Sequence, residues 1–315
     1  MKKLIKPAKR AVNQCLDVRK DEKVLVVTDE DRKSIGEAIL RASREVSADS
    51  SLEIIEKTGG HGREPGEEVK KKMEEADVVF APSTYSLTHT EARISACKKG
   101  TRVATLPGIT EAIFRDSLDA DYENIARLSE KLYRKLSKSD KVRVESPSGT
   151  DIVLKVFEKY WETDTGLIHD EGEFGNLPAG EVDGAPVEAE GKIVIDQLEM
   201  NGAEYAPPGT EVLIRNSKAV SISEDCRLSK AFQEVKNASN LAELGIGTNP
   251  EADLIGNLLQ DEKVLGTCHF AFGDSSSYGT GIESEIHWDC IIKKPTIYFD
   301  GEKIMDKGNL MVDTE

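Results

Sequence analysis

The stretch KVLVVTDEDRKSIGEAILRASREV, residues 23–46, joins a continuous apolar run to a segment with apolar residues at helical spacing. Its first part, KVLVVTD (23–29), predicts a buried strand that ends at a turn residue. In its second part, the apolar side chains fall on one face of a helix; they are Ile35, Ala38, Ile39, Ala42 and Val46. A strand followed by a helix is the repeating unit of a parallel sheet, so this stretch decides the fold of the first domain.

The same unit recurs through the first third of the chain. Further strands are expected at SLEIIEK (51–57), DVVFAPS (77–83) and TRVATLPG (101–108), and further helices at 8–16, 64–76 and 88–100. We therefore expect a doubly wound α/β domain with a parallel sheet over residues 1–140. No GxGxxG or GxxxxGK(S/T) motif follows any of these strands. The domain thus resembles a nucleotide-binding architecture without its phosphate loop.

A second domain of different character follows the charged helix that is expected at 121–139. One helix, at 227–240, interrupts a series of β segments; these are 141–146, 151–157, 192–200, 211–216, 264–272, 285–292 and 296–300. We predict that residues 141–315 form an α+β domain with a mainly antiparallel sheet. We also expect this domain, and not the first, to bind metal and carry the catalytic site, for the reasons given below. A long loop region is expected near 163–186, and loops of that length are often functional.

Charge and composition exclude several classes of partner. The chain has 58 acidic and 42 basic residues and a net charge of -16. This charge repels phosphate backbones and anionic lipids, so we expect neither nucleic acid nor membrane as a partner. No apolar stretch approaches the roughly 20 residues needed to span a bilayer. The five cysteines are scattered without a CxxC pair, which favours a cytoplasmic protein with reduced thiols.

Histidines and acids gather in HFAFGDSSSYGTGIESEIHWDC, residues 269–290. His287 and Asp289 are two apart in an expected strand, so their side chains leave the same face and can reach one ion. His269 ends an earlier β segment, and the glycine-rich connection can fold back to bring the imidazoles together. Such ligands suit zinc, cobalt, manganese or iron(II). The alternative is a pair of hydrogen-bonded core histidines joined by a loop.

Several ordered blocks add a resemblance to this pattern. The chain resembles the thermophilic metallo-aminopeptidases of the aminopeptidase T family in GNLPAGEVDGAPVE (175–188), AELGIGTNP (242–250), HFAFGDSSSYG (269–279), IHWD (286–289) and PTIYFDGEKI (295–304). The first domain adds weaker support in STYSLTHTEAR and ATLPGITEAI. The chain departs from the family in its shorter length, in the tyrosine's position and in a shorter loop before His287.

The resemblance implies a two-metal site and a hydrolase. Its metal ligands would be Glu181, Glu243, His269, His287 and Asp289, and Tyr278 would be the catalytic residue that donates to the developing oxyanion. Two zinc, cobalt or manganese ions would activate a water that cleaves the N-terminal bond of a small peptide. The resemblance also implies a homodimer. Taken without it, each glutamate would be a solvated surface carboxylate, although the glycines after Glu243 allow close approach of an ion or ligand.

Two other functions use the same residues. Dihydroxypyridine ring-cleaving dioxygenases resemble this family too, and their single iron(II) needs only His269, His287 and Asp289. A non-catalytic binding protein of the same fold, with a structural metal, is the third possibility. The number of bound ions separates the first two functions, and a fully coordinated ion without an open position would favour the third.

Overall fold

The structure, a computed structural model, describes residues 2–200 and 203–312 and divides into two compact units. Unit 1 comprises Met1–Ala126 and Thr165–Ala179, and unit 2 comprises Arg127–Asp164 and Gly180–Glu315. The sequence suggested a single boundary near residue 140. The observed division falls instead within helix α6 (Tyr122–Leu136), and a later segment of the chain returns to unit 1.

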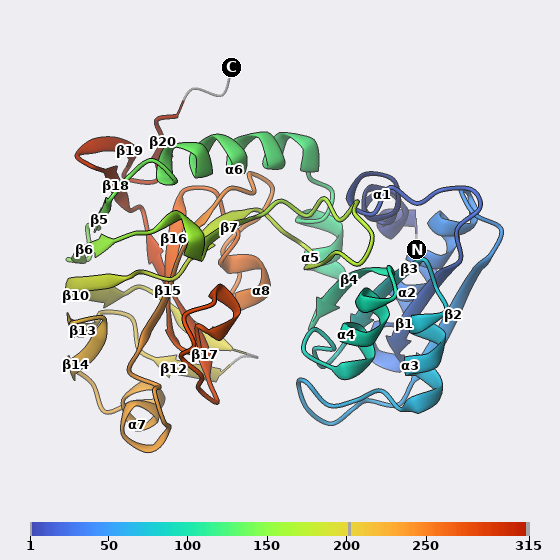
Figure 1. Ribbon diagram of the computed structural model, residues 1–315, viewed down its shortest axis with the longest axis horizontal. Helices are drawn as coiled ribbons and strands as arrows, with labels where there is room; N and C mark the ends of the chain where they lie inside the picture. Colours follow the sequence, from blue (N-terminus) through green and yellow to red (C-terminus); the bar gives the residue numbers. More distant parts are fainter. Residues whose placement is uncertain (1, 201–202, 313–315) are drawn as a thin grey trace. The chain divides into compact units, whose positions relative to one another are not determined.

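Unit 1 is built on a five-stranded parallel sheet with the strand order β2-β1-β3-β4-β8 (Figure 1). Its strands are β1 (Val24–Asp29), β2 (Ser50–Ile55), β3 (Val78–Ser83), β4 (Arg102–Pro107) and β8 (Phe174–Asn176). The predicted α/β fold with a parallel sheet is confirmed. The first four strands lie where apolar runs were found, and the fifth comes from the region expected to be a loop.

Helices cover both faces of this sheet. They are α1 (Ile5–Arg10), α2 (Lys33–Arg44), α3 (Glu67–Glu74), α4 (Glu91–Lys98) and α5 (Glu111–Asp116). Leu25 and Val27 point from β1 into a buried cluster with side chains of α3 and α4. Helix α2 contacts β1 and β2, and since successive side chains of a strand alternate, it covers the other face. The buried strands therefore read as continuous apolar runs because both their faces are covered.

Two antiparallel sheets form most of unit 2. The larger has the order β14-β13-β10-β6-β5-β18-β19-β20, and the smaller β17-β16-β15-β9-β7. The strands of the larger sheet are β5 (Lys141–Glu145), β6 (Asp151–Lys155), β10 (Glu188–Ile195), β13 (Thr210–Arg215), β14 (Lys218–Ile222), β18 (Thr296–Phe299), β19 (Glu302–Asp306) and β20 (Asn309–Leu310). Strands β11 (Leu198–Met200) and β12 (Ala203–Ala206) pair antiparallel as a separate two-stranded sheet. With helices α6, α7 (Arg227–Glu234) and α8 (Leu258–Asp261), the α+β class with a mainly antiparallel sheet is confirmed.

The smaller sheet carries the predicted metal ligands. Its strands are β7 (Trp161–Asp164), β9 (Glu181–Gly184), β15 (Leu241–Gly247), β16 (Thr267–Gly273) and β17 (His287–Lys293). One face of the smaller sheet contributes Leu244, Phe270 and Ile292 to the apolar core of unit 2. Side chains of the larger sheet belong to the same core. The alternate residues of the same strands point to the opposite face. That opposite face is free to carry polar side chains.

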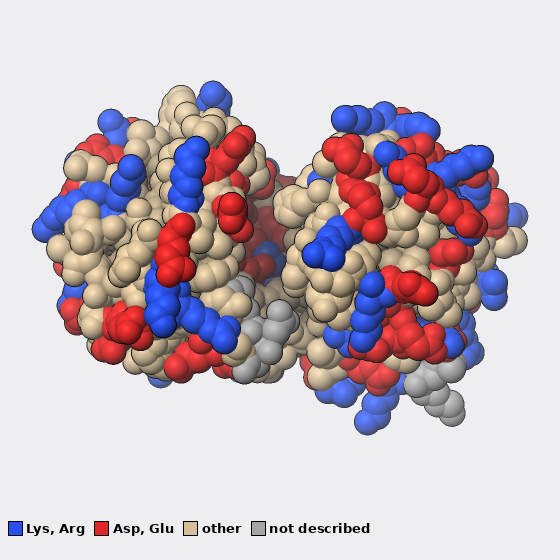
Figure 2. Space-filling view, turned by 90° about the horizontal axis from the view of Figure 1, so that it is seen from below, with Lys and Arg blue, Asp and Glu red and all other residues tan. Residues whose placement is uncertain are grey.

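Charges of both signs are mixed on the molecular surface. Figure 2 shows lysine and arginine side chains interspersed with aspartate and glutamate over the visible face. Among the helices in the part of the chain that the structure describes, none has the length and apolar character needed to cross a membrane. Part of the acidic excess is buried, because Glu181, Asp183, Glu243 and Asp289 are each at most 6% exposed.

Candidate metal centre

The polar face of the smaller sheet brings together residues from five strands. Its register places Asp183 and His269 on either side of Gly245, and Glu243 and Asp289 on either side of Ala271. Directly opposed residues of antiparallel strands point to the same face. The titratable side chains on this face include those of Glu162, Asp164, Glu181, Asp183, Glu243, His269, His287 and Asp289. The predicted ligands therefore meet although they lie far apart in the sequence.

Two glycines of β15 make room on this face. A Cβ atom on Gly245 would lie 2.1 Å from Cε1 of His269, so the imidazole ring occupies the space above this position. A Cβ atom on Gly247 would lie 2.2 Å from the carbonyl oxygen of Val264, where the chain crosses the sheet. The glycines were expected to permit the approach of an ion or ligand. What approaches them is the protein's own imidazole and backbone.

Replacement of Gly245 by alanine should displace the His269 ring and weaken metal binding. The added methyl would overlap the ring, and the surrounding strand leaves the backbone little freedom to move. We expect a loss of about 1–3 kcal/mol in unfolding free energy, together with weaker binding of a divalent cation, both measurable by thermal melting with and without the ion. Gly60→Ala is the control, since its methyl would meet only the flexible Arg63 side chain at 3.1 Å. Unchanged metal affinity in Gly245→Ala would contradict this packing.

Glu243 lies at the centre of the cluster, with its carboxylate between the two imidazoles. Nε2 of His269 is 2.8 Å from Oε1, and Nε2 of His287 is 3.0 Å from Oε2. Burial alone would raise the pKa of Glu243, but hydrogen bonds from both histidines hold this pKa well below its usual value. Both imidazole nitrogens therefore point toward one small volume.

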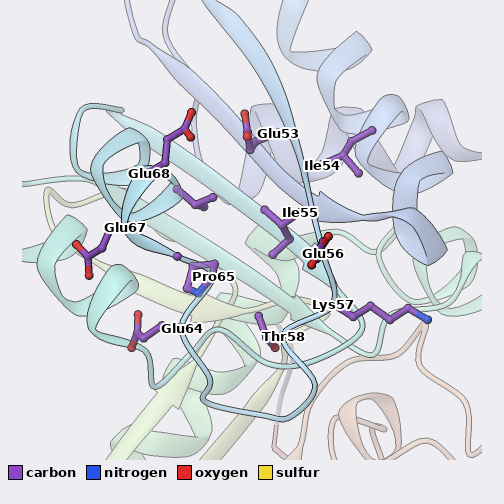
Figure 3. A pocket seen from close by; sticks show the side chains of 12 residues that line it. Glu53, Ile54, Ile55, Glu56, Lys57, Thr58, Glu64, Pro65, Glu67 and Glu68 are labelled. Carbon is purple, nitrogen blue, oxygen red and sulfur yellow. The ribbon is translucent and has the colours of Figure 1, made fainter.

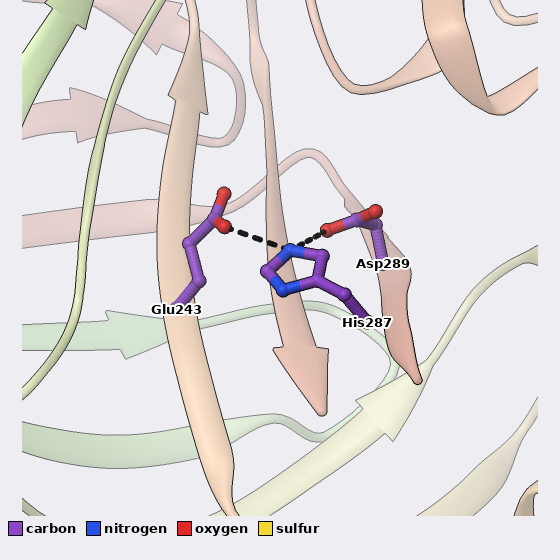
Figure 4. A group of neighbouring side chains, drawn as sticks. All are labelled: Glu243, His287 and Asp289. Atoms are coloured by element: carbon purple, nitrogen blue, oxygen red, sulfur yellow. Dashed lines mark ion pairs between the residues drawn. The ribbon is translucent and has the colours of Figure 1, made fainter. Parts of the chain in front are cut away.

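His287 and Asp289 complete a compact group of possible ligand atoms with Glu243 (Figure 4). Nε2 of His287 lies 3.4 Å from Oδ1 of Asp289, and one ligand atom from each of the three residues lies within 4.8 Å of the others. Nδ1 of His287 is 2.7 Å from the carbonyl oxygen of Asp274. A carbonyl can only accept, so Nδ1 carries a proton, and Nε2, which donates to Glu243 in the metal-free site, would give up its own proton to bind a metal.

His269 joins this group through Glu243. Its side chain is 1% exposed, and its Nδ1 is buried and has no hydrogen-bond partner in the described ranges 2–200 and 203–312. Burial would lower the pKa of His269, but the hydrogen bond to Glu243 and the nearby carboxylate charges raise it to about 10. A metal ion that bound here would take the place of the imidazole proton.

Glu181 is buried like Glu243 but has a different partner. It is 6% exposed, so the surface location that its residue type suggests is wrong for it, as it is for Glu243. The ammonium of Lys263 donates to Oε1, while Oε2 is buried without a hydrogen bond and lies 3.7 Å from Nε2 of His269. Burial raises the pKa of Glu181 to about 8. Glu181 therefore lies at the site as predicted, but it forms an ion pair with Lys263, a residue that the sequence did not point to.

Tyr278 links two carboxylates at the site. Its hydroxyl is 2.6 Å from Oδ2 of Asp183 and 2.8 Å from Oε2 of Glu243. Burial raises the pKa of Asp183 well above its usual value, whereas the pKa of Glu243 is lowered. A protonated Asp183 that donates to the phenol oxygen, and a phenol that donates to Glu243, satisfy both contacts with the available protons. Sequence reasoning missed Asp183, although its spacing from Glu181 in β9 places it on the same face.

These residues fit a divalent cation. Two imidazoles and the carboxylate of Asp289 supply nitrogen and oxygen ligands without a thiolate, a set that suits iron(II) when coordination positions stay open. Three buried polar atoms also have no hydrogen-bond partner among the described residues; they are Oε2 of Glu181, Oδ1 of Asp183 and Nδ1 of His269. Buried polar atoms are rarely left unpaired, which points to a bound group in the site.

A hollow in unit 1 is less suited to chemistry. It lies beside β2 and the segment before α3, with a volume of about 510 Å³. Its carboxylates, including those of Glu53, Glu64 and Glu67, point in different directions rather than toward one point (Figure 3). We therefore place the functional site in unit 2.

Comparison with a protein family identifies a relationship over nearly the whole chain. A family model described as NicX, 2,5-dihydroxypyridine 5,6-dioxygenase, matches residues 3–312. No curated protein matches the chain.

Two solved structures share the fold. The 2,5-dihydroxypyridine dioxygenase from Pseudomonas putida KT2440 has a TM-score of 0.79 at 18% identity, covering 98% of this chain and 97% of that chain. Wild-type AmpT, an aminopeptidase T from Thermus thermophilus, has a TM-score of 0.73 at 16% identity, covering 99% of each chain. At these identities, the likeness shows the fold alone.

The family match corrects the expected activity. The resemblance to metallo-aminopeptidases implied a hydrolase that acts on peptides, but the matching family is one of dioxygenases, which are oxidoreductases. The expected hydrolase, aminopeptidase and protease activities are therefore wrong. The error has a chemical cause, since His269, His287 and Asp289 belong to both expected ligand sets. The homodimer and the cytoplasmic location remain predictions.

Proposed function

Because this chain belongs to the 2,5-dihydroxypyridine 5,6-dioxygenase (NicX) family, we propose that it is an iron(II)-dependent dioxygenase that opens the ring of a dihydroxylated pyridine. The observation that carries this proposal is the convergence of His269 and His287 on one carboxylate, with Asp289 beside them. Two histidines and one aspartate with open positions are the usual ligand set of non-haem iron(II) oxygenases.

His269, His287 and Asp289 would hold the iron. When bound, iron(II) supplies the redox chemistry with molecular oxygen that amino-acid side chains lack. The side chain of His287 is 35% exposed, while that of His269 is 1% exposed. Solvent therefore reaches the ligand set from the His287 side, and we assign the approach of the substrate to that side.

Asp183, Tyr278 and Glu243 would handle the protons of the substrate. Ring cleavage of a hydroxylated pyridine requires a proton to leave a hydroxyl group and another to reach the opened product. The raised pKa of Asp183, caused by burial among other carboxylates, suits it to hold a proton near neutral pH. Within the part of the chain that the structure describes, its Oδ1 has no hydrogen-bond partner, and the Tyr278 hydroxyl connects its other oxygen to Glu243.

Oxygen consumption by the iron-loaded protein tests the proposal. We expect anaerobic loading with iron(II), followed by 2,5-dihydroxypyridine and air, to give oxygen uptake in proportion to substrate and loss of the ring's ultraviolet absorption. The zinc-loaded protein is the matched control, since zinc has no redox chemistry and should give no uptake. The proposal fails if the iron-loaded protein consumes no oxygen with any isomer of dihydroxypyridine.

A further inference from the structure

Lys263 is a fully buried cation on the polar face of the smaller sheet, and the proposed function does not use it. Its side chain is 4% exposed, and three carboxylates surround its ammonium. It donates to Oε1 of Glu181 and lies 3.0 Å from Oε1 of Glu262 and 3.4 Å from Oδ2 of Asp164. Lysine is almost never buried unless it is paired, so this position demands an explanation.

The backbone holds Lys263 at this position. The N–H of Asn249, just beyond β15, donates to the carbonyl of Lys263 at 2.9 Å, and the N–H of Lys263 donates to Gln260 at 3.0 Å. Gly247 leaves the space through which this segment crosses the sheet, because a Cβ there would lie 2.8 Å from the carbonyl carbon of Lys263. These backbone contacts hold Lys263 in place, so its ammonium is fixed beside the three carboxylates.

The three carboxylates around Lys263 would otherwise form a cation site. They come from β7, β9 and the segment after α8, and oxygen ligands of this kind bind divalent ions. Without a cation, the buried charge of Glu181 and the partly buried charges of Glu262 and Asp164 would repel one another and carry a desolvation penalty. Oε2 of Glu181, buried and unpaired, faces His269 at 3.7 Å. A second metal ion bound to Glu181 would have to share this carboxylate with the Lys263 ammonium, which holds Oε1 and would repel the added positive charge.

We propose that the Lys263 ammonium takes the place of a second metal ion at Glu181 and so limits this centre to one ion. This inference rests on the single iron of the proposed function and adds a reason for that number. Lys263 prevents a second metal ion from binding because its ammonium occupies that position and carries a positive charge. It does not contact the substrate. Glu181, Glu262 and Asp164 are its counter-ions, while His269, His287 and Asp289 keep the single ion.

Replacement of Lys263 by methionine tests the proposal through metal counting. Elemental analysis after incubation with excess manganese(II) and desalting should give one ion per wild-type chain and two per Lys263→Met chain. Lys135→Met is the matched control, since Lys135 pairs with Glu302 at 2.7 Å on the surface of unit 2 and should leave one ion. The double variant Lys263→Met/Glu181→Gln should return the count to one. Two ions in the wild-type protein, or one in a folded Lys263→Met, would overturn the proposal.

Glu181→Gln decides the matter if Lys263→Met does not fold. Glu181 serves here as a counter-ion and lies outside the ligand set, so this variant should still bind one manganese ion per chain. Loss of the ion would overturn the proposal. Failure of the two claims can be distinguished. Two wild-type ions with intact oxygen uptake would refute only the role of Lys263, and one ion without uptake would refute only the proposed function.

Discussion

Replacement of His287 by alanine should remove iron from the protein and abolish ring cleavage. The geometry fixes this residue for metal binding, since its Nδ1 is committed to the Asp274 carbonyl and its Nε2 points toward Glu243 and Asp289. The loss in iron affinity should exceed roughly 100-fold, the upper range for residues that only orient a ligand. Equilibrium competition with a coloured iron chelator measures it directly.

His169→Ala provides the control for this experiment. His169 is an exposed histidine of unit 1 whose Nε2 lies 2.9 Å from the carbonyl oxygen of Gln14. Its replacement should leave both the iron content and the oxygen uptake unchanged. If His287→Ala bound iron as tightly as the wild-type protein does, the assignment of the ligand set would be refuted.

Replacement of Glu243 by alanine should have the next largest effect, because one carboxylate positions three other side chains. It accepts hydrogen bonds from His269, His287 and Tyr278. Without it, the two imidazoles lose the partner that orients them in the metal-free site and are free to turn away from the metal position. We expect iron affinity to fall by about 10- to 100-fold, as is typical when a group that orients metal ligands is removed.

Two further variants separate positioning from charge at Glu243. Glu243→Gln keeps the shape but offers one acceptor oxygen, so only one imidazole stays oriented and the loss should be intermediate. Tyr278→Phe removes a single contact to this carboxylate and should reduce iron affinity least. An alanine variant with wild-type iron affinity would show that Glu243 does not organise the centre.

The sequence predicted those elements that carry a strong local pattern. The apolar runs of β1, β3 and β4 are buried on both faces, so each strand was visible without knowledge of its neighbours. Strands β8 and β9 lie in a segment rich in glycine and proline that suggested a loop. They are strands because β4 and β15, distant in sequence, offer them backbone partners. Tertiary pairing outweighs local propensity there.

The sequence predicted which residues gather at the candidate site, but it did not predict the charge balance of the site. His287 and Asp289 share a strand face by their spacing alone, and Asp183 follows Glu181 by the same rule. Lys263 has no such signal, because a single lysine among many acquires its role only when Glu181, Glu262 and Asp164 fold around it. Residues common to a hydrolase and a dioxygenase could not separate the two activities. That distinction depends on the number and kind of metal ions.

The source of the oxygen atoms in the product tests the central claim most directly. The iron-loaded protein would be given 2,5-dihydroxypyridine in an atmosphere of ¹⁸O₂, and the ring-opened product would be weighed by mass spectrometry. If the protein is a dioxygenase whose iron(II) is held by His269, His287 and Asp289, both atoms of one oxygen molecule should appear in each product molecule. A ring-opened product that carries no ¹⁸O would contradict the account.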